Sequence, residues 1–226
     1  MQDNLLLIDK PAGWTSFDVV AKIRGIRRQQ LLEVARGGEG KGAAGATDLF
    51  RTPRDEGKPS VVPHVTKRQL RVGHAGTLDP FATGLLIILL GDGTKKAGEF
   101  LKLDKTYEAT FVLGSASTTG DPEGEITKLS GKIPTRDKVE RTLQKFTGTI
   151  TQIPPAYSAI KVGGQRAYKL ARAGKRVDIP AREVTIYTLE LLSYEYPELK
   201  IRTHVSSGTY IRTLAEDIGA ALGTSA

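Results

Sequence analysis

The sequence contains no cysteine, one methionine, one tryptophan and three histidines among 226 residues. Without cysteine the chain has no disulfide bond, no thiolate zinc site and no cysteine nucleophile. His64, His74 and His204 form no HxH or HxxxH pair, so we expect no metal. No apolar run approaches the roughly 20 residues of a membrane helix, and the opening apolar run, which is cut by Asp9, predicts a strand rather than a signal peptide. We therefore expect a cytoplasmic protein without a membrane partner.

Acidic residues are also under-represented. The chain has 25 Asp and Glu against 33 Lys and Arg, a net charge of +8 and a pI of about 9.6. This imbalance favours a polyanionic partner such as a nucleic acid, although a protein that is merely basic stays an alternative. With 39% hydrophobic and 26% charged residues the composition is that of a globular protein, and the length suits one larger domain, 1–226.

Hydrophobic periodicity predicts an irregular mixture of strands and helices. Thr15 and Asp18 have the spacing of a capping box that opens a helix. The segment 84–90 predicts a central strand that is buried on both faces. Further strands are expected at 5–8, 107–113, 184–187, 189–194 and 199–205, and further helices at 139–146 and within a capped segment, 206–222. Because strands and helices do not alternate regularly, the pattern favours an α+β fold.

Two segments depart from this pattern. Residues 36–63 are rich in Gly, Ala, Pro and scattered charge, which predicts a flexible surface insertion without a catalytic role. Residues 153–182 combine prolines, glycines and two tyrosines with many cations. We expect this second segment to form an exposed arm that contains a short helix.

One carboxylate stands out in "GHAGTLDPFATGLL". Pro80 favours an extended backbone at Asp79, which places the carboxylate on a turn that enters a buried strand. Asp79 is then either an Asx-turn acceptor or a nucleophile or base held at a cleft. In the second case it needs a cation, and Arg212 in the first turn of the last helix is the candidate. Taken alone, Arg212 is better interpreted as a solvated helix arginine, and the pairing does not follow from the spacing.

The same stretch resembles the catalytic signature of the TruB family of tRNA pseudouridine synthases. Four further segments resemble family motifs in the family's order: "LLLIDKPAGWTSFDVV", "DKTYEATFVLGSASTTGDPEG", "IPPAYSAIKVGGQRAYKLARAG" and "SSGTYIRTLAEDIG". Together they cover most of the chain outside the insertion. The resemblance implies the pseudouridine synthase catalytic fold, an α+β fold with a mixed, largely antiparallel central sheet flanked by helices.

The resemblance also implies an activity. Such enzymes isomerise uridine to pseudouridine in the T loop of tRNA, at position 55, without cofactor or metal; we expect a monomer that binds the T arm. Asp79 would be the nucleophile, held ionised by Arg212. The target uridine must be flipped out of its loop, and Tyr107 would stack on it and assist loss of the C5 proton.

The remaining site residues are expected to contact the substrate. The resemblance places Tyr210 at the uracil, His74 in the space that the flipped base leaves, and Lys10 near the site. Arm 153–182 would grip the RNA through its cations. Other interpretations stay open from the sequence alone: a core tyrosine at Tyr107 or Tyr210, and a turn residue at His74.

The chain departs from the family pattern in two places. Family members pass more directly from the first helix to the Asp79 motif, without the 36–63 insertion. The sequence also stops at "GAALGTSA", where family members continue into a strand and often a PUA domain, so we expect a fragment or a reduced form without a C-terminal PUA domain. A tRNA-binding or tRNA-folding module with weak or no catalysis is the alternative, and a synthase for other RNAs is a third possibility.

Overall fold

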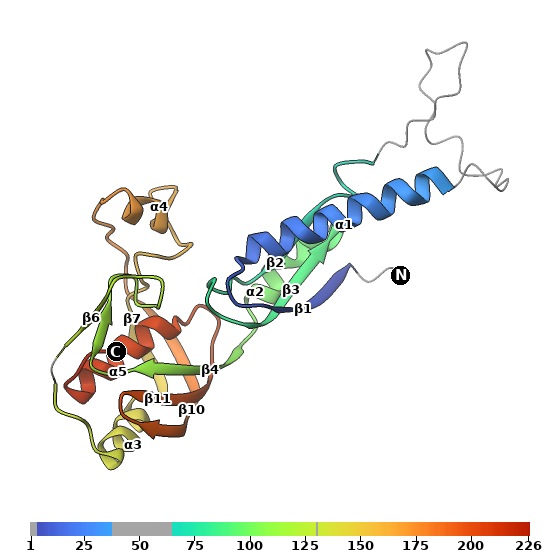
Figure 1. Ribbon diagram of the computed structural model, residues 1–226. Helices are drawn as coiled ribbons and strands as arrows, with labels where there is room; N and C mark the ends of the chain where they lie inside the picture. Colours follow the sequence, from blue (N-terminus) through green and yellow to red (C-terminus); the bar gives the residue numbers. More distant parts are fainter. Residues whose placement is uncertain (1–3, 38–64, 130) are drawn as a thin grey trace, which may run out of the picture. The chain divides into compact units, whose positions relative to one another are not determined.

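The computed structural model describes residues 4–37, 65–129 and 131–226 (Figure 1). Its contacts divide the chain into two compact units, Met1–Leu101 and Lys102–Ala226. The expectation that 1–226 forms one catalytic domain stays a prediction.

The first unit is a small antiparallel sheet with one long helix on it. Its strands, in the order β1-β3-β2, are β1 (Leu5–Lys10), β3 (Gly84–Leu90) and β2 (Val72–Ala75). Helix α1 (Ser16–Gly37) runs along the sheet (Figure 1). Two short helices, η3 (Gly91–Lys96) and α2 (Ala97–Leu101), follow β3 in the chain. The core lies between α1 and the sheet and consists of Val19, Val20, Val72, Leu86, Ile88 and Leu90.

The predicted capping box at the start of α1 is confirmed. The backbone N–H of Thr15 donates to Asp18 Oδ2 at 2.9 Å, and the N–H of Asp18 donates to Thr15 Oγ1 at 3.0 Å. These reciprocal bonds satisfy backbone donors that a helix start otherwise leaves without partners. The local sequence therefore fixes where α1 begins.

The expectation that β3 is buried on both faces is only partly correct. Leu86 and Ile88 are buried beneath α1, whereas Leu85 is 63% exposed. Leu85 pairs with Asp9 on β1, and cross-strand partners share a face of the sheet. The strand is central, as predicted, but α1 covers only one of its faces.

The second unit is built on a four-stranded antiparallel sheet in the order β4-β11-β10-β7. Its strands are β4 (Lys105–Val112), β7 (Gly148–Gln152), β10 (Arg182–Glu195) and β11 (Glu198–Val205). Helices α3 (Arg136–Lys145) and α5 (Ile211–Leu222) pack on it; Leu214, Ile218 and Leu222 of α5 are fully buried in its core. A hairpin of β5 (Ser115–Ser117) and β6 (Ile126–Lys128) completes this body.

The arm, residues 153–182, carries its own small elements between β7 and β10. They are β8 (Lys161–Val162), β9 (Gln165–Arg166) and α4 (Ala167–Arg172), the short helix that the sequence predicted (Figure 1). All strand pairs of the described residues are antiparallel, and helices and strands are mixed irregularly along the chain. The α+β class is confirmed.

Two local predictions in the second unit are wrong. The separate strands expected at 184–187 and 189–194 are one strand, β10, with irregular register between Ile186 and Thr188 and again between Leu191 and Ser193. Such bulges interrupt the alternation of side chains without ending the strand. Helix α5 begins at Ile211, and its N-cap, Tyr210, makes no side-chain capping bond.

The predicted insertion, 36–63, falls outside the described residues except for its first two positions, which continue α1. Among the helices that the structure describes, none is long and apolar enough to cross a membrane.

Candidate active site

Asp79 lies in the loop between β2 and β3, residues 76–83, which we call the Asp79 loop. The residue is half-buried, and its backbone carbonyl accepts a hydrogen bond from Ala82 N–H at 3.1 Å. Gly76 opens the loop with a positive φ of 101°, a conformation that side-chain-bearing residues rarely adopt. The sequence prediction of a carboxylate on a turn that enters a buried strand is confirmed.

Segment 10–16 holds this loop on both sides of Asp79. On the N-terminal side, Ser16 Oγ accepts from the Leu78 N–H at 3.0 Å and donates to the Leu78 carbonyl at 3.2 Å. On the C-terminal side, the Pro80 carbonyl accepts from the Gly13 N–H at 2.8 Å. The backbone before and after Asp79 is therefore fixed by a segment more than 60 residues away in the sequence.

Lys10 contributes to the same support. Its side chain is fully buried, and its ammonium donates to three carbonyls: Pro11 at 3.0 Å, Trp14 at 2.7 Å and Pro80 at 3.2 Å. A buried ammonium needs such acceptors, because an unsolvated charge is costly. These contacts give Lys10 a role in holding the Asp79 loop, and its expected proximity to the substrate stays a prediction.

His74 lies on β2, opposite Ile88 of the central strand. Its Nδ1 is 2.6 Å from the Gly76 carbonyl. Because a carbonyl only accepts, Nδ1 carries the proton in this contact, which fixes the orientation of the ring. The predicted residues Lys10, His74 and Asp79 all belong to the first unit, on neighbouring elements.

Arg212, a predicted residue of the second unit, binds three groups outside its own helix. Its Nη1 donates to the Thr119 carbonyl at 2.9 Å and to Asp121 Oδ2 at 3.0 Å, and its Nη2 donates to the Tyr157 carbonyl at 2.9 Å. Only 11% of its side chain is exposed. The alternative of a solvated helix arginine is therefore excluded. Arg212 joins α5 to two segments more than 50 residues away.

Asp121 is the functional candidate that sequence reasoning missed. It lies in a loop at 117–124, which we call the Asp121 loop, and its side chain is 7% exposed. Its Oδ1 accepts from Thr119 Oγ1 at 2.7 Å and from the Glu123 N–H at 3.0 Å, while Oδ2 faces Arg212. A sequence signal existed: Asp121, like Asp79, precedes a proline in a glycine-containing loop. Because both partners are largely withdrawn from water, removal of either one would leave an uncompensated buried charge.

The two predicted tyrosines have different surroundings. Tyr107 lies on β4 opposite Thr203, half-buried against the core of the second unit. Tyr210 has its backbone held by the buried Gln152, whose side chain accepts from the Tyr210 N–H at 3.0 Å and donates to its carbonyl at 3.2 Å. The Arg182 guanidinium lies 5.0 Å from the centre of the Tyr210 ring, a cation–π geometry. Gln152 and Arg182 were not predicted, because neither contact leaves a periodic signal.

The predicted residues thus fall into two groups. Lys10, His74 and Asp79 belong to the first unit, and Tyr107, Tyr210 and Arg212 to the second. The pairing of Asp79 with Arg212 stays a prediction. Within the first unit, the local chemistry suits acid–base or nucleophilic catalysis by a carboxylate on a rigid loop.

Comparison with known proteins assigns the family. Residues 64–211 match the model of the N-terminal domain of the TruB family of pseudouridylate synthases. The chain is 42% identical over 226 residues to a tRNA pseudouridine synthase B of Phocaeicola vulgatus, an alignment that covers 100% of this chain and 82% of that protein. The chain belongs to the TruB family.

Two other TruB relatives are matched over a smaller share of their own length. The tRNA pseudouridine synthase B of Nitrosospira multiformis is 51% identical over 158 residues, which cover 68% of this chain and 50% of that protein. The Burkholderia lata protein of the same name is 40% identical to this chain over 224 residues, an alignment that covers 99% of this chain and 57% of that protein. The chain thus spans about half the length of these two relatives.

The fold agrees with this assignment. A chain from the crystal structure of a Cbf5–Nop10–Gar1 complex superposes with a TM-score of 0.60 at 26% identity, covering 98% of this chain and 45% of that one. The TruB family match contains His74, Asp79, Tyr107 and Tyr210, and it ends one residue before Arg212.

Proposed function

We propose that this chain isomerises uridine to pseudouridine in the T loop of tRNA, at position 55, with Asp79 as the nucleophile. The observation that carries the proposal is membership of the TruB family, established by a match that spans Asp79, together with relatives named tRNA pseudouridine synthase B. The rigid support of the Asp79 loop fits this role, because a nucleophile must be held in place before the substrate arrives.

The reaction breaks the C1′–N1 glycosidic bond, rotates the uracil and joins C5 to C1′. The proton on C5 is lost and N1 gains one, so the change is an isomerisation that consumes no co-reactant. Asp79 attacks C6 of the ring or C1′ of the ribose, or assists departure of uracil as a glycal forms. Each route needs an ionised carboxylate.

Arg212 would keep Asp79 ionised by charge pairing. A guanidinium carries five N–H donors in a rigid plane. It can therefore hold Asp121 and the Thr119 and Tyr157 carbonyls and still meet a second carboxylate. In this scheme Asp121 orients the arginine rather than reacting itself.

The substrate uridine would be flipped out of the T loop, at a cost of a few kcal/mol of unstacking. Stacking on Tyr107 would recover about 1–3 kcal/mol. Tyr210, which is fixed by Gln152 and faces Arg182, would contact the uracil, and His74 would displace the base. Both tyrosines are half-buried residues.

The arm would bind the phosphates of the T arm. Between 161 and 182 it carries seven Lys and Arg residues against one acid, Asp178. Lys161, Arg166, Lys169 and Arg172, which lie on β8, β9 and α4, are exposed. The Arg212–Tyr157 contact anchors the base of the arm to α5, the helix that bears Arg212. RNA held by the arm would thus be coupled to the catalytic arginine.

The decisive experiment measures pseudouridine formation on a T-arm transcript with wild-type protein and with Asp79→Asn. We expect the variant to lose activity while it binds the transcript with wild-type affinity. A wild-type chain that binds the T arm tightly but forms no pseudouridine contradicts the proposal and identifies a tRNA-binding module. Equal activity on RNAs without a T loop contradicts the assigned substrate.

A further inference from the structure

The first unit carries an open hollow over the start of α1 that the proposed chemistry does not use. It is lined by Gly13, Trp14, Asp18, Ala21 and Lys22 and has a volume of about 360 Å³. Small-ligand sites range from about 300 to 1,000 Å³. The hollow is therefore large enough for a single nucleotide and too small for a folded partner.

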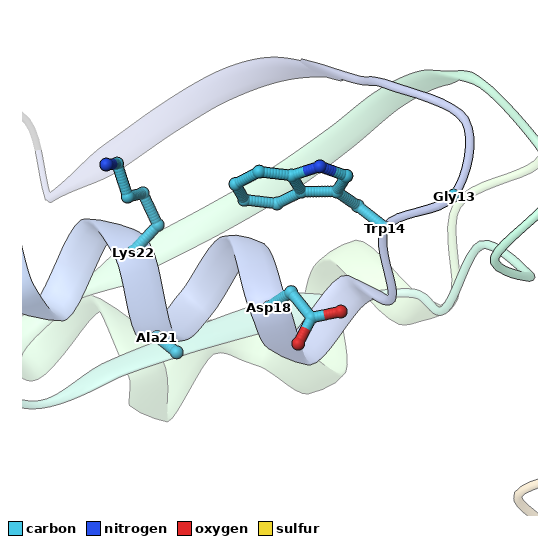
Figure 2. A pocket seen from close by; sticks show the side chains of 5 residues that line it. All are labelled: Gly13, Trp14, Asp18, Ala21 and Lys22. Carbon is cyan, nitrogen blue, oxygen red and sulfur yellow. The ribbon is translucent and has the colours of Figure 1, made fainter.

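The wall of the hollow is an indole presented to solvent. Trp14 is 39% exposed, and its ring extends along α1 toward the side chain of Lys22 (Figure 2). The backbone beneath it is fixed, because Lys10 Nζ donates to the Trp14 carbonyl at 2.7 Å and the Gly13 N–H donates to the Pro80 carbonyl. An exposed aromatic ring on a rigid backbone is the usual platform on which a nucleobase stacks.

The two charged groups of the hollow restrict what fits. Lys22 is exposed, and no ion pair involves it among the residues that the structure describes. Asp18 uses Oδ2 for both contacts with Thr15, and those bonds hold its pKa below the usual range, so it is ionised at neutral pH. A phosphate would be attracted to Lys22 and repelled by Asp18, whereas an exocyclic amine of a base could donate to Asp18.

We propose that this hollow binds one unpaired nucleotide of the RNA substrate, with its base stacked on Trp14 and its phosphate beside Lys22. The position of Asp18 favours a base that carries an amino group, namely adenine, cytosine or guanine, over uracil. The nucleotide is distinct from the target uridine. The inference rests on the proposed function only in taking the ligand as substrate RNA.

The hollow is also linked to the Asp79 loop. Gly13 lines the hollow and donates to Pro80, the residue after Asp79. A nucleotide on Trp14 would therefore act on the segment that holds the nucleophile. Occupation of the hollow would orient the RNA relative to the first unit independently of the arm, which belongs to the second.

The chain offers a direct probe, because Trp14 is its only tryptophan. Wild-type protein is titrated with hexamers of riboadenylate and of ribouridylate while the tryptophan emission is recorded. We expect quenching by the adenylate hexamer, an affinity at least about fivefold weaker for the uridylate hexamer, and a loss of affinity as salt rises. Lys22→Ala should weaken the binding of the adenylate hexamer about 5- to 10-fold.

Matched controls separate this site from general surface effects. Phe17 is 63% exposed on the same helix and Arg28 is an exposed cation further along it, yet neither lines the hollow. Phe17→Ala and Arg28→Ala should leave the quenching curve unchanged within about twofold. On the T-arm transcript, Trp14→Leu should raise KM about 5- to 150-fold, the range for loss of one stacked base, with kcat changed much less.

The outcomes are distinguishable from failure of the proposed function. Pseudouridine formation without any change in Trp14 emission, and with normal KM in Trp14→Leu and Lys22→Ala, overturns this inference alone. Quenching by the hexamer without pseudouridine formation supports the hollow and contradicts the proposed function. Quenching by adenosine monophosphate at the same concentrations as the hexamer identifies a free-nucleotide site and overturns the assignment to RNA.

Discussion

The Ser16→Ala substitution tests whether segment 10–16 positions the nucleophile. Ser16 is only 3% exposed, and its hydroxyl bonds both the N–H and the carbonyl of Leu78, the residue before Asp79. Alanine keeps the volume of the site nearly constant and removes both bonds. The perturbation therefore acts on the backbone of the Asp79 loop without removing any group that would touch the substrate.

The expected magnitude follows from the groups left without partners. Two backbone groups lose hydrogen bonds at about 1–3 kcal/mol each, and because Leu78 is half-buried, water replaces part of them; we expect a loss of about 2 kcal/mol in unfolding free energy. Misplacement of a catalytic group by about 1 Å costs up to about 100-fold in rate. We therefore expect kcat to fall by about 10- to 100-fold and KM for the transcript to stay within about threefold.

Thr15→Ala is the matched control. It removes the neighbouring hydroxyl, which caps α1 through Asp18 and, among the described residues, makes no hydrogen bond with Leu78. Loss of such a cap costs about 1 kcal/mol, so this variant is also destabilised. Its kcat should nevertheless stay within about twofold of wild type.

The assay combines single-turnover pseudouridine formation, thermal unfolding and amide exchange at Leu78, all at a temperature where both variants are folded. Faster exchange at Leu78 in Ser16→Ala alone is expected. If the two variants lose the same fraction of kcat, or if Ser16→Ala loses stability but no kcat, then segment 10–16 is merely structural and the positioning argument is refuted.

Three further predictions follow from the second unit. Asp121→Asn removes the charge partner of the largely buried Arg212, so we expect the unfolding free energy, measured by denaturant titration, to fall by about 3 kcal/mol. We also expect kcat, measured by turnover, to fall with little change in RNA binding. Burial raises the pKa of Glu216 above its ordinary value of 4.5, with Asp217 adding to the effect and Arg212 opposing it. The folded chain thus holds the Glu216 proton more tightly than the unfolded chain does. Protonation therefore stabilises the folded state at low pH, and this stabilisation is lost as pH rises through the folded pKa. Glu216→Gln, which cannot ionise, should raise Tm at pH 7 and much less at pH 4. Lys169→Ala should weaken transcript binding and reduce the slope of log affinity against log salt by about one, and an unchanged slope would remove this lysine from the phosphate contacts.

The sequence was sufficient for features that depend on near neighbours. The capping box of α1 joins Thr15 and Asp18, three residues apart, and its geometry is as predicted. The alternation along β4 and the buried face of α5 also follow from local periodicity. Each of these patterns repeats within a few residues, where the backbone geometry alone fixes which side chains share a face.

The supports of the candidate site could not be predicted in this way. Ser16 and Leu78 are 62 residues apart, Gln152 and Tyr210 are 58, and Asp121 and Arg212 are 91. Single polar side chains that bind a distant backbone leave no periodic trace. The sequence predicted two strands where the structure has the single strand β10, because its bulges break the alternation of side chains on which the prediction depends.

The two loops that bear the carboxylates are held by the same physical device. Each carboxylate precedes a proline, which restricts its backbone, and each loop contains a glycine with positive φ, Gly76 or Gly120. Distant side chains then bond the loop's backbone: Ser16 holds one loop and Arg212 the other. Ser16 reaches only backbone atoms of its loop, so it fixes the position of Asp79 without occupying that carboxylate, whereas Arg212 binds both the backbone of its loop and the Asp121 carboxylate. Substitutions at the supports should therefore lower kcat more than affinity, whereas substitutions on the arm should do the reverse. This division of effects would not arise if the loops were ordered only when RNA binds.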